Sequence, residues 1–140
     1  MARVLGIDLG SRRIGVAVSD GLGLPAQPRA TLARKGGVRD LEAIAAAVKE
    51  ANADRIVLGL PLDPEGHEGP AAQRARVFGD KLRSALHLPV DLIDESFSTV
   101  EAEAVLLAAD VSRARRKQVV DKMAAAVILQ RWLDAQKESP

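Results

Sequence analysis

The order of β-type and helical segments is the feature that most constrains the fold of this chain. Three β-type segments come first, and helical and β-type segments alternate after them. The expected strands cover residues 3–9, 14–19, 29–32, 55–60 and 90–93, and the expected helices cover 38–51, 71–87, 98–109 and 118–136. This order predicts an α/β fold with a mixed five-stranded sheet flanked by helices. Sites in such sheets lie at the carboxyl ends of the parallel strands.

The composition excludes several classes of protein. The chain has 140 residues, 47% hydrophobic and 28% charged, which is typical of one globular domain. A net charge of +1 excludes a histone-like polycation but leaves nucleic-acid binding open. Two Phe and one Trp are too few for rows of base-stacking side chains, and the lack of Cys excludes thiolate metal sites and Cys nucleophiles. No apolar stretch is long enough for a secretory signal or a membrane helix, so we expect a cytoplasmic protein with no membrane partner.

Two acidic positions fall at the ends of expected strands. Asp8 lies in the first strand between Gly6 and Gly10, although Asp is disfavoured in strands and a charge inside a sheet needs a partner. Asp94 and Glu95 follow the last expected strand, and because adjacent strand residues point to opposite faces, only one of them should enter a site. Each position has a simpler interpretation, since Asp8 could cap the turn after its strand and the other two could be an ordinary acidic loop.

Asp121 is the third acidic candidate, near the start of the last expected helix. Its helical neighbours Ala124, Ala125 and Ile128 form a small apolar face that lets the helix pack close to the sheet. An acid beside that face would lie toward the end of the sheet. Two simpler interpretations are an i,i+4 pair with Lys117 and stabilisation of the N-terminus of the helix.

Together, these acids predict a metal site. Asp8, Glu95 and Asp121 could converge at one end of the sheet. Their oxygen ligands, in a chain with no Cys and two His, favour a hard divalent ion, so Mg²⁺ or Mn²⁺ is the expected cofactor. Two such ions about 4 Å apart activate water and stabilise the leaving oxygen of a phosphodiester. The three acids are therefore candidate catalytic residues as well as metal ligands.

Basic residues near these acids predict a polyanionic substrate. One cluster precedes Asp121, and a pair lies in the hairpin turn beside Asp8. The candidate nucleic-acid-binding residues are Arg12, Arg13, Arg113, Arg115, Arg116 and Lys117. Arg and Lys neutralise phosphates, whereas the simpler interpretation of the cluster is a solvated loop. Arg74 and Arg76, which follow the loop at 61–70, are weaker candidates.

Four segments resemble the YqgF, or RuvX-like, family, in order and over nearly the whole chain. They are GIDLGSRRIGVAVSD at 6–20, IVLGLPLDPEGHEGPAAQRARVF at 56–78, DESFSTVEAE at 94–103 and VDKMAAAVILQRWL at 120–133. The resemblance implies an RNase H-like fold, with residues 1–140 as a single RNase H-like nuclease domain. It also implies that Asp8, Glu95 and Asp121 are the metal-binding catalytic acids. The family commonly has Arg where this chain has Ser96, so a phosphate contact from that position is not expected here.

The resemblance also implies a reaction and its partners. Such a protein would be a metal-dependent nuclease that matures the 5′ end of precursor 16S rRNA in ribosome biogenesis, acting on RNA more readily than on DNA. Ribosomal precursor particles are further expected partners, and both a monomer and a homodimer fit the sequence. One alternative is a Holliday junction resolvase, which cuts two strands symmetrically and so works as a dimer. A non-catalytic RNA-binding assembly factor is another, as is an actin-like ATPase fragment with Asp8-Leu9-Gly10 in its phosphate loop, although 140 residues hold only one of its two domains.

Overall fold

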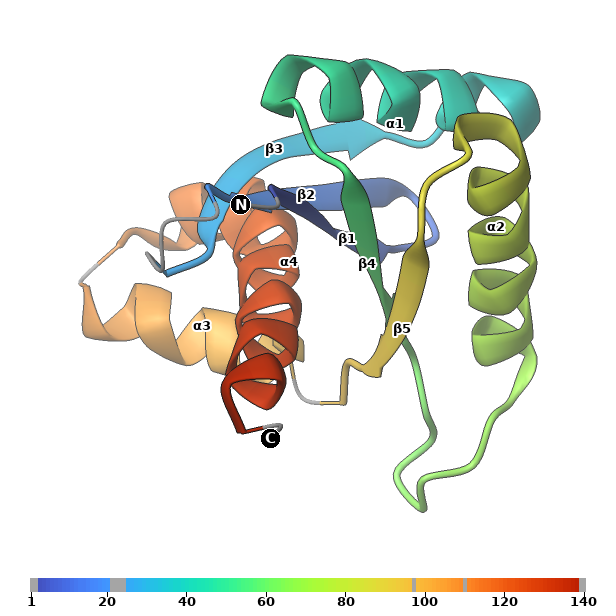
Figure 1. The fold of residues 1–140 in the computed structure, drawn as a ribbon. Coiled ribbons are helices and arrows are strands. Elements are labelled where there is room, and N and C mark those ends of the chain that lie inside the picture. The colour runs from blue at the N-terminus through green and yellow to red at the C-terminus, as the bar shows by residue number, and fades with distance from the viewer. Residues whose placement is uncertain (1–2, 21–24, 97, 110, 139–140) are drawn as a thin grey trace.

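A mixed sheet of five strands forms the centre of the molecule. The computed structural model describes residues 3–20, 25–96, 98–109 and 111–138. The strand order is β3-β2-β1-β4-β5, in which β1 pairs parallel with β4 and β4 with β5, while β2 runs antiparallel to both of its neighbours (Figure 1). The strands are β1 Val4–Leu9, β2 Arg13–Ser19, β3 Gln27–Ala33, β4 Arg55–Leu60 and β5 Val90–Asp94. The predicted mixed five-stranded sheet is confirmed.

Helices cover both faces of this sheet. The helices are α1 Gly37–Ala51, α2 Pro70–Leu86, α3 Ser98–Ala108 and α4 Arg113–Glu138. In Figure 1, α1 and α2 lie on one side of the sheet, and α4 crosses the other side with α3 packed against it. Within the described ranges, no helix combines the length and the apolar composition needed to cross a membrane.

Helix α4 begins five residues earlier than expected, at Arg113 instead of residue 118. Its first turn is capped by Ser112, whose hydroxyl accepts a hydrogen bond from the backbone N–H of Arg115 and whose carbonyl accepts one from that of Arg116. The basic cluster before Asp121 is therefore helical and not a loop, although Arg113 and Arg115 are exposed as that interpretation expected.

The two faces of the sheet are packed differently. Large aliphatic side chains, including Leu5 and Ile7 of β1, fill the face under α1 and α2. On the opposite face β1 presents Gly6, and a Cβ there would come within 2.7 Å of Leu129 Cβ on α4. A Cβ at Gly15 of β2 would likewise overlap the backbone carbonyl oxygen of Asp121 in α4. The predicted close approach of α4 to the sheet is thus confirmed, and it depends on glycine in the strands beneath the helix.

Candidate active site

Asp8 and Glu95 lie together at the carboxyl edge of the sheet. Asp8 is the penultimate residue of β1, and Glu95 directly follows β5, on the other side of β4. The backbone N–H of Glu95 donates to the carbonyl of Leu60 at 3.2 Å, which fixes Glu95 beside the end of β4. Gly59 of β4 provides the space, because a Cβ there would overlap the Glu95 carboxylate. Two acids from opposite sides of β4 are thereby brought into one site.

Both carboxyls have raised pKa values, and burial is the largest cause for each. Burial raises the pKa of Glu95 to about 8, and the negative charge of Asp8 adds to the effect. Burial also raises the pKa of Asp8, with the charge of Asp121 acting in the same direction and a hydrogen bond with Glu95 opposing it. The Oε2 atom of Glu95 is buried, and no described residue gives it a hydrogen bond. In the free protein at neutral pH, Glu95 is therefore mostly protonated, and a cation bound at this site would favour its ionised form.

Asp121 lies beside this pair but is bound to a cation. The Nε atom of Arg13, at the start of β2, donates to Asp121 Oδ2 at 2.5 Å. The packing of α4 on β2 places Asp121 near Asp8. The backbone of Asp121 lies on Gly15 of β2, and Gly15 is paired with Asp8 in the sheet. Asp121 is in the third turn of α4, so the interpretation that it stabilises the helix N-terminus is wrong. The side chain of Lys117, its other expected partner, lies outside the described residues.

The expected phosphate-binding residues fall into two groups. Arg12, Arg13, Arg113 and Arg115 are exposed, and Arg13 is also paired with Asp121. Arg116 instead holds the junction between α3 and α4, because it donates to the carbonyl of Val111 at 2.7 Å and pairs with Glu103 at 3.5 Å. The exposed arginines are therefore better placed than Arg116 to meet a polyanion.

Arg131 of α4 is a neighbour of the site that the sequence did not indicate. It donates to the backbone carbonyl of Asp94 at 3.1 Å, and its charge lowers the pKa of Glu95 without outweighing the burial of that carboxyl. The pKa of Asp94 is lowered mainly by hydrogen bonds with Ser96, and the charge of Arg131 adds to this effect. Asp94 itself turns away into the loop, where it accepts a hydrogen bond from the backbone N–H of Ser96. No residue spacing links positions 94 and 131, because their contact depends on the angle at which α4 crosses the sheet.

A second acidic group lies in the loop between β4 and α2. It consists of Asp63, Glu65 and His67. Each of these residues has an oxygen or nitrogen atom that can bind a metal, and the three atoms lie within 4.8 Å of one another. Among the described residues, this is the one such group of three or more. All three are exposed, and Asp63 Oδ1 already accepts hydrogen bonds from the backbone N–H groups of the other two. The expected triad is less tightly gathered, since Asp121 is turned toward Arg13. The molecule thus carries acidic groups compatible with a divalent ion, without fixing which ion.

Solved structures of two proteins bound to Holliday junctions share this arrangement of strands and helices. Thermus thermophilus RuvC bound to a Holliday junction matches with a TM-score of 0.59 and 15% identity, over 99% of this chain and 98% of that one. The Fowlpox virus resolvase in complex with Holliday junction DNA matches with a TM-score of 0.60 and 10% identity, over 98% and 99%. At these identities the likeness shows the fold alone. The predicted RNase H-like fold is confirmed.

Sequence comparison specifies the family within this fold. The family model described as "RuvX: Holliday junction resolvase" matches residues 2–135. A Myxococcus xanthus protein named "Putative pre-16S rRNA nuclease" is 52% identical, over 96% of this chain and 89% of its own length. A Geobacillus kaustophilus protein of the same name is 49% identical, over 96% and 99%. The chain therefore belongs to the RuvX family of nucleases, which confirms the predicted family and enzyme class.

Proposed function

We propose that this chain is a divalent-metal-dependent nuclease that processes precursor 16S rRNA, with its active site at Asp8, Glu95 and Asp121. The observation that carries the proposal is the pairing of Asp8 with Glu95 at the carboxyl edge of the sheet. The raised pKa values mean that the ionised form of this pair is unfavourable without a cation, and a bound cation would stabilise that form.

The residues present fit a hard divalent ion. The donors are all carboxylate oxygens, and the orphaned Oε2 of Glu95 is a buried acceptor that a cation would satisfy. Asp8, Glu95 and, once released from Arg13, Asp121 would hold the ion. Mg²⁺ or Mn²⁺ bound there supplies activation of water and stabilisation of the leaving oxygen in phosphodiester hydrolysis.

The remaining charged residues position the substrate. Arg13 neutralises Asp121 in the free protein and lies at the start of β2, where a phosphate would compete for its guanidinium. Arg113 and Arg115 are exposed in the first turn of α4, two turns before Asp121. We assign these three arginines to the phosphates that flank the cleaved bond.

RNA is the proposed substrate because the relatives at 49–52% identity carry that substrate in their names. Precursor ribosomal RNA would also place the protein in the cytoplasm and bring it to ribosomal precursor particles. A four-way DNA junction is the second candidate, favoured by the description of the family model. Cleavage of a junction would require a homodimer, since two strands must be cut symmetrically.

A cleavage assay tests the proposal. Purified protein is incubated with end-labelled precursor rRNA, with single-stranded RNA and with a four-way DNA junction, each with Mg²⁺, with Mn²⁺ and with EDTA. We expect metal-dependent cleavage of the precursor rRNA and its loss in Asp8→Asn. Faster cleavage of the junction by a dimer would transfer the function to the second candidate.

Tight RNA binding with no metal-dependent cleavage would contradict both nuclease proposals. That result would favour a non-catalytic assembly factor. Equal cleavage by the wild type and by Asp8→Asn would point to a contaminating nuclease and would also contradict the proposed site.

A further inference from the structure

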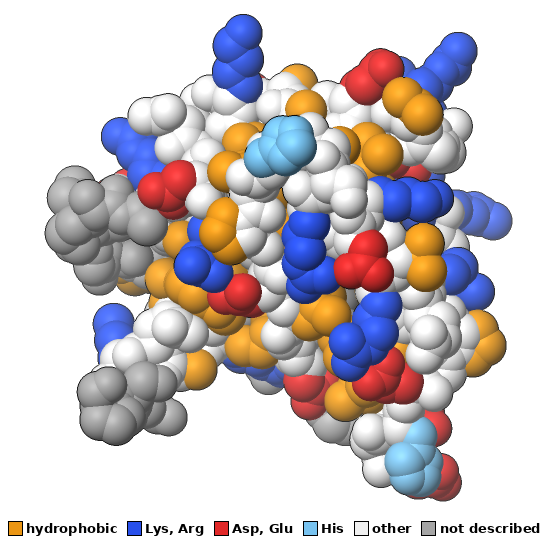
Figure 2. All heavy atoms as spheres, turned by 45° about the vertical axis from the view of Figure 1, so that its right-hand side comes forward, with side chains coloured by type: hydrophobic (Ala, Val, Ile, Leu, Met, Phe, Trp, Pro, Cys, Tyr) orange, Lys and Arg blue, Asp and Glu red, His pale blue; other side chains and the backbone are white. Residues whose placement is uncertain are grey.

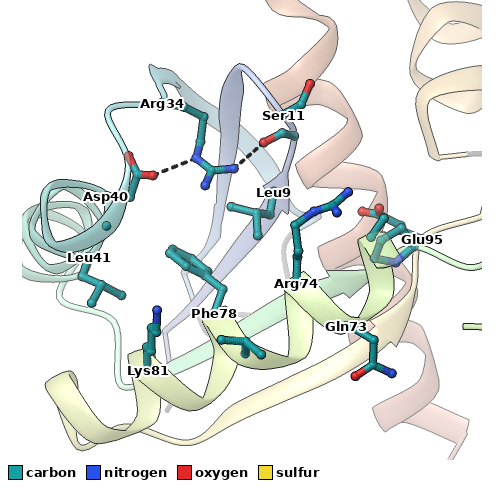
Figure 3. A pocket seen from close by; sticks show the side chains of 15 residues that line it. Leu9, Ser11, Arg34, Asp40, Leu41, Gln73, Arg74, Phe78, Lys81 and Glu95 are labelled. Carbon is teal, nitrogen blue, oxygen red and sulfur yellow. Dashed lines mark hydrogen bonds and ion pairs between the residues drawn. The ribbon is translucent and has the colours of Figure 1, made fainter. Parts of the chain in front are cut away.

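A cavity of about 530 Å³ opens at the same edge of the sheet as the acids. It lies between the β1–β2 turn, the start of α1 and helix α2, and Glu95 lines one end of it (Figure 3). This volume falls within the range of about 300–1,000 Å³ that small-molecule sites occupy. The cavity is thus a concave extension of the proposed active site.

The wall of this cavity is largely apolar. Leu9 of β1, Leu41 of α1 and Phe78 of α2 contribute to it, and Figure 3 shows their side chains turned toward the same space. Val77 also lines it and is 51% exposed, which makes it one of the most exposed large hydrophobic side chains among the described residues. A flat apolar group bound here would cover surface that is now in water.

Two cations that line the cavity, Arg74 and Lys81, have no partner among the residues that the structure describes. They make no hydrogen bond or ion pair with any described residue, and Figure 3 shows Arg74 pointing toward the end lined by Glu95. Arg34, also in the wall, is bound to Asp40 and to the Gly10 carbonyl. Figure 2 shows Lys and Arg side chains beside apolar ones on the side of the molecule that carries α2. The cavity therefore offers positive charge next to an apolar wall.

This combination fits one ligand chemistry. A nucleotide presents a flat base that packs on apolar side chains or on a guanidinium plane, and a phosphate that needs a cation. We propose that the cavity binds one unpaired nucleotide of the substrate strand, next to the bond that is cut, with its base on Leu9, Val77 and Phe78 and its phosphate on Arg74 or Lys81. This inference rests on the proposed nuclease function, because Glu95 lines the cavity and is also a residue of the proposed active site.

Binding without divalent metal tests the inference, because no cleavage can then occur. The probe is a short fluorescein-labelled single-stranded RNA, titrated with the wild type, with Arg74→Ala/Lys81→Ala and with Lys49→Ala/Lys137→Ala, which removes the same charge from two exposed lysines at other helix ends. We expect roughly ten-fold weaker binding or more for the cavity variant and near wild-type binding for the control. The salt dependence should flatten by about 1.4 in log–log slope, since two contacts of about 0.7 each are lost.

Abasic substitutions, made one at a time along the strand, test the base-binding part. We expect one position at which loss of the base weakens binding to the wild type, and no effect at that position in Val77→Asp. All of these substitutions change exposed side chains, so each variant should keep the wild-type melting temperature. Wild-type affinity in Arg74→Ala/Lys81→Ala, or equal sensitivity to every abasic site, would overturn the inference.

Three further outcomes separate this inference from the proposed nuclease function and from free-nucleotide binding. If adenosine 5′-monophosphate binds as tightly as the strand, the cavity is a site for a free nucleotide and the assignment to the substrate is wrong. If the cavity variants lose RNA binding while the wild type cleaves nothing with Mg²⁺ or Mn²⁺, the cavity is an RNA-binding site, and the nuclease proposal fails together with the placement beside a cut bond. Cleavage and binding both unchanged in the variants would overturn the cavity assignment alone.

Discussion

Two acidic groups near the same edge of the sheet are treated in opposite ways. Asp40, in the first turn of α1, is 2% exposed and accepts hydrogen bonds from Arg34 Nε at 2.7 Å and from the backbone N–H groups of Lys35 and Gly36. Burial alone would raise its pKa, but these donors hold the pKa below the usual value. Glu95 has no such donors for Oε2, and its pKa is raised to about 8.

The difference separates a structural acid from a functional one. Asp40 is neutralised by its own chain, and Arg34 extends the connection to the Gly10 carbonyl, so the pair ties α1 to the β1–β2 turn. Asp8 and Glu95 have no cationic side chain bound to them in this way, so a bound metal ion would have to supply the positive charge. Buried charge stabilises a fold only when it is paired, and an unpaired set of carboxyls reduces stability in exchange for binding capacity.

Removing an acid of the proposed active site should have the largest effect. We expect Asp8→Asn to lower the cleavage rate on the order of 10³-fold, about 4 kcal/mol of transition-state stabilisation, because one of the cation's ligands is lost. Single-turnover cleavage of labelled precursor rRNA measures this. The free energy of unfolding without metal should stay equal or rise, since a repulsive charge is removed. A loss of stability equal to the loss of activity would contradict the functional role.

The same isosteric change at Asp40 should have the reverse result. We expect Asp40→Asn to reduce the free energy of unfolding by about 3 kcal/mol, because Arg34 is left partly buried without its counter-charge. Urea denaturation followed by circular dichroism measures this. A cost below about 1 kcal/mol would mean that the pair is no more than a surface ion pair.

The stability of the metal-free protein should depend on pH in opposite senses for the two groups. The folded-state pKa of Glu95 is raised from 4.5 to about 8, so its contribution is complete below about pH 4.5 and is lost as the pH rises toward 8. Asp40 has a lowered pKa, so its contribution is present above its ordinary 3.8 and is lost as the pH falls. Of these two groups, only Glu95 therefore changes the stability between about pH 5 and 8, and it lowers the stability as the pH rises.

We therefore expect the metal-free wild type to lose about 2 kcal/mol of stability across that range, after allowance for solvent screening. Urea denaturation at a series of pH values measures it, and Glu95→Gln is the matched control that should abolish most of the slope. A stability that rises from pH 5 to 8 in the wild type would contradict the raised pKa.

Loss of the Arg13–Asp121 pair should give the smallest effect. The Arg13 side chain is 52% exposed, so Arg13→Gln should change stability by no more than about 1 kcal/mol. Because Asp121 is then released, we expect a few-fold tighter binding of Mn²⁺ in the absence of substrate, measured by calorimetry. Arg29→Gln, which breaks the exposed pair with Glu50, is the control. Unchanged Mn²⁺ affinity would argue that Asp121 is not a ligand.

Much of the site follows from the sequence because strand and helix periods are local. The placement of Asp8 and Glu95 at strand ends, and the small face of α4, could be predicted from single segments. The start of α4 could not, because its first turn is rich in Arg and Lys and offers no apolar period. Its remaining signal was Ser112, a common capping residue.

Contacts between distant segments were beyond prediction for a physical reason. Arg13 and Asp121 are 108 residues apart, and their contact depends on how closely α4 can approach β2. Gly15 sets that distance, because a larger residue there would overlap the backbone of Asp121. The sequence shows the glycine but does not show which residue packs on it. The cavity beside α2 could not be predicted for the same reason. Its walls come from α1, α2 and the β1–β2 turn, and Arg74 becomes a strong candidate for phosphate binding only when these three segments are placed together.

Calorimetric titration of the protein with Mn²⁺ at pH 7, in buffers of different ionisation enthalpy, tests the central claim most directly. If Asp8 and Glu95 form the metal site, binding should release about one proton in the wild type, because a carboxyl with a raised pKa must ionise. Glu95→Gln should lose both the proton release and most of the affinity, while Asp63→Asn/His67→Ala in the loop should keep them. Wild-type binding in Glu95→Gln, with loss in the loop variant, would contradict the account and move the metal site to the loop.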